Sequence, residues 1–120
     1  MKTDIQEFIG LLFLSRDFAH KAHLNTTSYA QHMALNSFYD EIVELADSLA
    51  EAYQGRKLEL IGEIPALQSP KGEPLSVLKR HLEVLEDTRD IFGDDTAIQN
   101  IVDEIVGLYL STIYKLKFLK

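Results

Sequence analysis

The sequence predicts an all-α protein, an antiparallel four-helix bundle with one long crossover between its second and third helices. Apolar residues recur three and four positions apart in four segments, and no segment alternates as a half-buried strand does. Glycine, proline and capping residues separate these segments, at residues 25–28, 55–73 and 93–95. We expect residues 1–120 to form a single domain, because a composition of 46% hydrophobic and 26% charged residues is typical of one compact unit.

The first helix is expected to open with a capping box, in which Thr3 and Gln6 satisfy the free backbone groups of its first turn. The segment from Ile9 to Leu14 is apolar on almost every side, so we expect it to be covered on more than one face. Such covering suggests an oligomer interface. The apolar positions of this helix are Ile5, Phe8, Ile9, Leu12, Phe13 and Ala19.

The second helix is expected to begin after Ser28, whose hydroxyl can cap it together with Gln31. It should run to about Gln54 and stop at Gly55, because glycine readily adopts the left-handed conformation that ends helices. Alternating steps of four and three residues define its apolar stripe, which consists of Leu35, Phe38, Ile42, Leu45, Leu49 and Tyr53.

The crossover at residues 55–73 holds two prolines, and a short helical turn is expected in it from Leu58 to Ile64. Pro74 suits the first turn of the third helix, which should end at Gly93. The apolar stripe of this helix is Leu75, Leu78, Leu82 and Leu85.

The fourth helix has two candidate caps at its start, Asp95 and Thr96, and Gln99 would complete a capping box with Thr96. Isoleucine and leucine recur along it at helical spacing, as expected of a helix with one side in the core. The stripe comprises Ile98, Ile101, Ile105, Leu108 and Ile113.

Charge and composition exclude several classes of function. The net charge is −7, and the only basic cluster is Lys115, Lys117 and Lys120, so we expect no nucleic-acid binding. There is no cysteine and therefore no thiolate metal site or disulfide. No apolar run is long enough to span a membrane, and the first residues carry no secretory signal, so a cytoplasmic protein without a membrane partner is expected.

A polar face of the second helix lies roughly 140° around the helix from its apolar stripe. It therefore faces either water or another subunit. Its spacing is that of paired ligands, because His32 and Asn36 lie one turn apart, as do Asp47 and Glu51. His32 and Glu51 are about 28 Å apart along a helix and cannot hold one ion within a chain. Two antiparallel copies of this helix would bring the histidine end of one against the acidic end of the other.

Several of these residues resemble those of Dps proteins, the ferritin-like miniferritins. The first helix ends in "AHKAHLN", Ala19–Asn25, which is similar to the "AHxxHWN" of that family, with Leu24 in place of the tryptophan. His32, Asn36, Asp47 and Glu51 also fall in the family's register, and the last helix resembles its counterpart. Asn36 replaces a carboxylate, and the basic tail with which family members bind DNA is absent. Short phage-encoded proteins share this appearance.

The resemblance implies a ferritin-like fold, a two-fold homodimer or dodecamer, and a ferroxidase centre shared between subunits. One chain would supply His23, His32 and Asn36, and its mate would supply Asp47 and Glu51. The implied metal is iron, with zinc as a possible substitute. A neutral amide at position 36 stabilises a cation less than a carboxylate does, so weak or slow oxidation of Fe(II) is expected.

Less specific interpretations stay open for each of these signals. The histidines can be surface or capping residues, and Asp47 with Glu51 can be a solvated acidic face. Asp17, His20 and His23 offer an alternative metal site within one chain. His81 is expected at the surface beside Arg80, and Tyr39 and Tyr53 are expected to be packing residues. A different class of function is a non-catalytic ferritin-like oligomer that binds a protein or a small ligand without iron chemistry.

Overall fold

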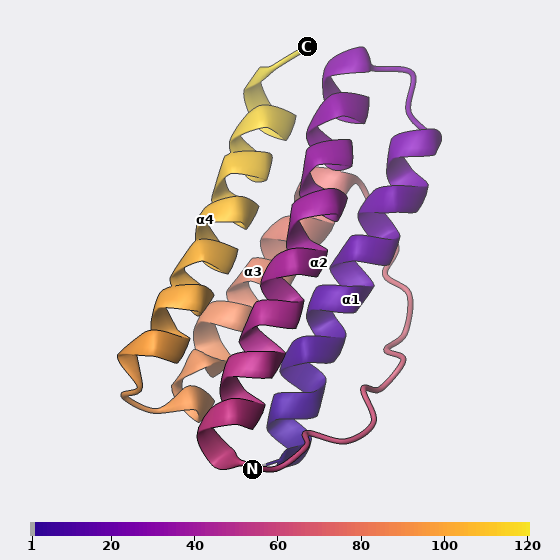
Figure 1. The fold of residues 1–120 in the computed structure, drawn as a ribbon. Helices are drawn as coiled ribbons and strands as arrows, with labels where there is room; N and C mark the ends of the chain where they lie inside the picture. Colours follow the sequence, from indigo (N-terminus) through magenta and orange to yellow (C-terminus); the bar gives the residue numbers. More distant parts are fainter. Residues whose placement is uncertain (1) are drawn as a thin grey trace.

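A computed structural model describes residues 2–120, in which four α-helices pack together and no strand occurs (Figure 1). The all-α class predicted from the sequence is confirmed. The elements, in chain order, are α1 (Lys2–Leu24), α2 (Tyr29–Lys57), α3 (Pro74–Thr88), the short 3-10 helix η1 (Arg89–Phe92) and α4 (Thr96–Phe118).

The four helices lie side by side in a molecule that measures 45 × 26 × 22 Å. Figure 1 shows α1 and α4 running in one direction and α2 and α3 in the other. Helix α1 packs against α2 and α3, and α4 packs against the same two helices, so every packed pair is antiparallel. The connection from α2 to α3 follows the outside of α1 to the opposite end of the molecule. None of the helices in residues 2–120 is long and apolar enough to cross a membrane.

The core consists of side chains from all four helices, and most positions of the predicted stripes are buried in it. Phe38 of α2 packs edge-on against Tyr109 of α4, with ring centroids 4.9 Å apart. Tyr109 is fully buried although it lies outside the predicted stripe of α4. The largest fully buried side chains are Tyr109, Phe38, Ile5, Ile9, Leu12, Leu35, Ile42, Leu49, Ile61, Leu78, Leu85 and Ile105.

Two predicted helix starts are confirmed and one is wrong. The Ser28 hydroxyl accepts a hydrogen bond from the Gln31 backbone N–H at 3.1 Å, and Pro74 lies in the first turn of α3. Helix α1 already includes Lys2, so Thr3 lies inside the helix and is not its cap. Gln6 donates instead to the carbonyl of Ile61 in the crossover, at 2.8 Å, so it serves tertiary packing.

The end of α2 also differs from the prediction. The helix continues through Gly55 to Lys57, and Leu58 takes the left-handed conformation with φ 55°. The Gln54 side chain accepts the backbone N–H of Ile61 at 2.9 Å, and Ile61 is buried. We attribute the later helix end to this anchor, because burial of Ile61 offsets the strain of a left-handed leucine. No helical turn forms at residues 59–64.

The crossover covers the apolar segment of α1 that had suggested an oligomer interface. A Cβ atom on Gly10 would lie 3.0 Å from the carbonyl oxygen of Pro65, so the two backbones are in direct contact. Ile64 and Leu67 of the crossover pack against the core, and Leu67 lines a pocket together with Leu11. Only Phe13 of this segment is more than a third exposed. The apolar character of residues 9–14 therefore has an explanation within one chain.

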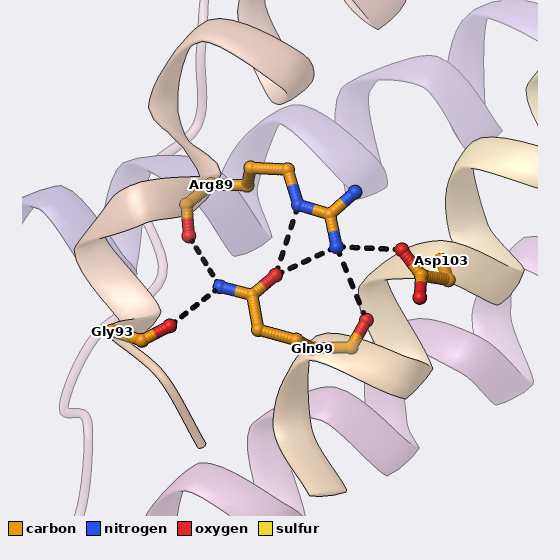
Figure 2. A network of polar contacts seen from close by, with 4 residues as sticks. All are labelled: Arg89, Gly93, Gln99 and Asp103. Atoms are coloured by element: carbon orange, nitrogen blue, oxygen red, sulfur yellow. Dashed lines mark hydrogen bonds and ion pairs between the residues drawn. The ribbon is translucent and has the colours of Figure 1, made fainter. Parts of the chain in front are cut away.

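The turn between α3 and α4 is held by a polar network (Figure 2). The Arg89 guanidinium donates to the Gln99 side-chain oxygen and to Asp103, both at 2.7 Å. The Gln99 amide in turn donates to the carbonyls of Arg89 and Gly93. Gln99 is thus occupied elsewhere, and the predicted box with Thr96 is wrong. Asp95 caps α4 by accepting backbone N–H groups of its first turn.

Candidate functional site

Two of the predicted metal ligands meet where α1 ends and α2 begins. His23 lies in the last turn of α1, and His32 lies one turn into α2. Their rings stack with centroids 4.5 Å apart and planes 28° apart. His23 is 6% exposed although it is polar, and His32 is half-buried. The short turn between the helices therefore brings both imidazoles to one place.

Backbone carbonyls orient both imidazoles. His23 Nδ1 lies 2.5 Å from the carbonyl oxygen of His20, and His32 Nδ1 lies 2.7 Å from that of His23. A carbonyl oxygen can only accept, so each Nδ1 carries a hydrogen, which leaves Nε2 as the nitrogen that can bind a metal. Metal-binding histidines are commonly oriented in this way, with the second ring nitrogen bonded to a carbonyl or carboxylate.

Tyr39 and Asn36 complete the cluster from the next turns of α2. The Tyr39 hydroxyl donates to Asn36 Oδ1 at 2.8 Å, and its oxygen lies 3.5 Å from His23 Nε2. The Tyr39 ring also stacks on His20, with centroids 4.1 Å apart and planes 13° apart. The sequence predicted that Tyr39 is a packing residue. In the structure its hydroxyl also joins the polar cluster. Tyr39 follows His32 by seven residues, which is two helical turns, so both lie on one face of α2. This spacing was the sequence signal that could have placed Tyr39 in the cluster.

The acidic pair does not join this cluster within one chain. Asp47 and Glu51 are exposed on α2, one turn apart and far along the helix from His32. In residues 2–120 no three histidine or acidic side chains are grouped closely enough to hold a metal ion. The alternative set of Asp17, His20 and His23 is therefore not formed. Asp17 is paired instead with Lys21, at 2.9 Å.

A second polar cluster, which the sequence did not predict, lies in the core. Tyr109 of α4 donates to the Ser15 hydroxyl of α1 at 2.7 Å, and Ser15 Oγ lies 2.6 Å from His81 Nδ1 of α3. All three side chains are buried, so the expectation of a surface His81 is wrong. Burial, with a smaller effect of Arg80, lowers the pKa of His81 to about 4. Burial also raises the pKa of Tyr109.

A cavity lies next to the histidine cluster but is separate from it. It has a volume of about 790 Å³ and is lined by the end of α1, the α1–α2 turn and the end of the crossover. None of the side chains of His20, His23, His32, Asn36 and Tyr39 lines it. The cluster is therefore a group of side chains that pack against one another outside this cavity.

The fold and the cluster define a small helical protein with a histidine-rich site where α1 ends and α2 begins. Comparison with known proteins places the chain in the family of unknown function DUF5856, whose pattern matches residues 23–116. The chain is also 30% identical over 114 residues to an uncharacterized 14.6 kDa protein in the mobD-ri intergenic region of enterobacteria phage T4. That match covers 92% of this chain and 85% of the phage protein. No solved structure is significantly similar.

Proposed function

We propose that this protein is a ferritin-like, Dps-type iron-binding protein that oxidises Fe(II) slowly at a site shared between two subunits. The observation that carries the proposal is the orientation of His23 and His32. Both rings donate Nδ1–H to a backbone carbonyl, so Nε2 is the nitrogen left to bind a ligand. Neutral imidazole with this orientation is a common ligand of iron and zinc.

A second copy of the chain would complete the site. Two histidines from one chain leave most of the coordination sphere of iron open, and no acidic side chain joins them in residues 2–120. Asp47 and Glu51 are exposed one turn apart, a spacing at which two carboxylates can reach one ion. A two-fold pairing of α2 with α2 would bring them to the partner's histidines. Assembly into a dodecamer rests on the resemblance to Dps proteins.

The substrate at such a site is Fe(II), and the chemistry is a one-electron oxidation of each ion by an external oxidant such as hydrogen peroxide. The Asp47 and Glu51 carboxylates favour the Fe(III) product, because fixed negative charge offsets its additional positive charge. Asn36 contributes no charge, and its Oδ1 already accepts the Tyr39 hydroxyl. Both facts support weak binding and slow turnover.

A second candidate function is a non-catalytic ferritin-like scaffold that binds another molecule through the same face of α2. It is favoured by the neutral residue at position 36 and by the hydrogen bond that occupies it. Under this alternative, the histidine cluster only joins α1 to α2. It predicts no specific binding of Fe(II), Co(II) or Zn(II).

Subunit mixing tests the shared site directly. One variant carries His23→Ala and His32→Ala, and the other carries Asp47→Ala and Glu51→Ala. Each alone should bind no Fe(II) and oxidise none. Co-expressed chains should recover up to about half of the wild-type binding, because a mixed pair retains one intact site of its two.

Fe(II) oxidation is followed by absorbance and metal binding by calorimetry, with Glu44→Gln as a control for an exposed carboxylate elsewhere on α2. Asn36→Asp should bind iron more tightly and oxidise it faster, since it restores a charged ligand. If wild type and Asn36→Asp both fail to bind metal, the scaffold alternative replaces the iron-binding proposal.

A further inference from the structure

We propose that Tyr39 is a third ligand from the same chain and binds ferric iron through its phenol oxygen alongside His23 and His32. This inference rests on the proposed function and adds to it a residue that the sequence had assigned to packing. It also gives Asn36 a role that does not require it to bind the metal. We expect iron to bind between donor atoms of Tyr39, His23 and His32, three side chains that the α1–α2 turn brings together.

The position of the hydroxyl carries the inference. Tyr39 Oη lies 3.5 Å from Nε2 of His23, a side chain that is only 6% exposed. The Tyr39 hydrogen is directed to Asn36 Oδ1, 2.8 Å away, and His23 has its own hydrogen on Nδ1. The Tyr39 oxygen and His23 Nε2 are therefore close enough to bind one ion together. A cation bound by both atoms would replace this single long contact with two attractive ones.

Neighbouring rings hold these donors in place. His20 stacks on the Tyr39 ring at 4.1 Å, and His32 stacks on the His23 ring at 4.5 Å. Stacked rings restrict rotation of the phenol and of the imidazoles, so little side-chain order has to be created when a metal binds. Oxygen donors of tyrosine serve as iron ligands in proteins, and an anionic oxygen suits the ferric ion.

The binding step is an exchange of a proton for a metal. The O–H bond of Tyr39 breaks, its proton passes to solvent, and a bond forms between the phenolate oxygen and Fe(III). No electron is transferred in this step. The iron keeps its oxidation state, and the net charge of the site rises by two.

Asn36 suits a phenolate better than an aspartate would. Its Oδ1 accepts the hydrogen of the neutral phenol, and after a half-turn of the amide its Nδ2–H can donate to the phenolate. A carboxylate at this position could only accept, and its charge would repel a phenolate. The replacement of a carboxylate by an amide at residue 36 is then matched to the tyrosine, and Tyr39 supplies the negative charge that position 36 lacks.

Visible spectroscopy tests this assignment, because ferric iron bound to a phenolate absorbs visible light by ligand-to-metal charge transfer. Ferric nitrilotriacetate is titrated into the full chain as wild type, Tyr39→Phe, Tyr53→Phe and Asn36→Asp. Wild type and Tyr53→Phe should develop the band, and resonance Raman excitation within it should enhance ring modes of tyrosinate. Tyr39→Phe should lose the band. Asn36→Asp should also lose it, since the carboxylate would hold the hydroxyl hydrogen and displace the phenol as ligand.

Calorimetry with Co(II) on the same four proteins separates this inference from the proposed function. If wild type binds Co(II) through its histidines and shows no ferric band, the iron site stands and the ligand role of Tyr39 is overturned. The same conclusion follows if Tyr39→Phe keeps the band. If wild type binds neither metal, both proposals fail. Circular dichroism of Tyr39→Phe confirms that loss of the band is not loss of the fold.

Discussion

Ser15, His81 and Tyr109 form a polar chain through a core that is otherwise apolar. They come from α1, α3 and α4, so their hydrogen bonds link three helices at one level. Tyr109 donates to Ser15, and the Ser15 hydroxyl can in turn donate to Nδ1 of a neutral His81. No buried side-chain nitrogen or oxygen of residues 2–120 lacks a partner. Burial makes this cluster favour an uncharged His81.

Acid should destabilise the fold through His81. Its pKa is lowered to about 4 in the folded chain, mainly by burial, from an ordinary value of 6.5. Between these two values the unfolded chain binds a proton that the folded chain does not, so stability falls as the pH drops from 6.5 toward 4. We expect a loss of about 1–2 kcal/mol from this group, with allowance for partial solvent screening.

Urea denaturation of wild type and His81→Gln at pH 7 and pH 4.5 measures this effect. The glutamine variant keeps a polar group but has no titration, so its stability should change less between the two pH values. The difference between the two proteins isolates His81 from His20, His23 and His32, which both retain. Equal losses on acidification in both proteins would contradict the assignment.

The crossover determines which part of the α1 surface is exposed to solvent. Residues 9–14 look like an interface from sequence, and the chain's own connection covers them. The Pro65 carbonyl approaches Gly10 closely enough that a side chain there would meet backbone. In α4, by contrast, Gly107 has no atom within 4 Å of where a Cβ would lie. Both glycines are inside helices, where alanine is intrinsically preferred by about 1 kcal/mol.

Alanine substitution at these two glycines should therefore have opposite outcomes. Gly107→Ala is expected to raise the free energy of unfolding by about 0.5–1 kcal/mol, because it gains helix propensity without a contact. Gly10→Ala is expected to lower it by about 1 kcal/mol or more, because the displaced crossover loses packing. Chemical denaturation of the two variants compares them directly. A stabilising Gly10→Ala would show that the crossover moves aside freely.

The whole molecule carries a net charge of −7, and the acidic end of α2 is exposed. Such a surface repels phosphate backbones and attracts cations. A shared metal site would couple metal binding to association, because an ion that binds only the pair shifts the equilibrium toward it. The proposed shared site requires a two-fold pair of chains.

Light scattering at micromolar protein should therefore give a mass of at least two chains when Zn(II) is present. Removal of the metal with a chelator should lower the mass, and the variant without His23 and His32 should not respond to metal. A monomeric mass for the wild type in saturating Zn(II) would contradict the paired arrangement. The same samples should give no gel shift with duplex DNA at physiological salt.

The sequence by itself determined the features that depend on neighbours along the chain. Four apolar periodicities gave four helices, since burial of one face follows directly from spacing. Ser28 and Pro74 act within a single turn, and both lie at helix starts as predicted. His23, His32 and Asn36 were selected by spacing and by resemblance, and the structure brings these three together. The polar face of α2 that holds Asp47 and Glu51 was also predictable from residue spacing, because the geometry of an α-helix is fixed.

Only the tertiary structure decided the features that depend on a contact between distant residues. Leu58 ends α2 because Ile61 is anchored to Gln54 and the core. The local sequence favoured Gly55 as the helix end, because no nearby residue gave a stronger signal. His81 is buried because Ser15, 66 positions earlier, offers it a hydrogen bond. Tyr39 reaches His23 because the α1–α2 turn folds one helix against the other. In each case the deciding free energy comes from burial or a hydrogen bond to a distant partner, which sequence spacing does not encode.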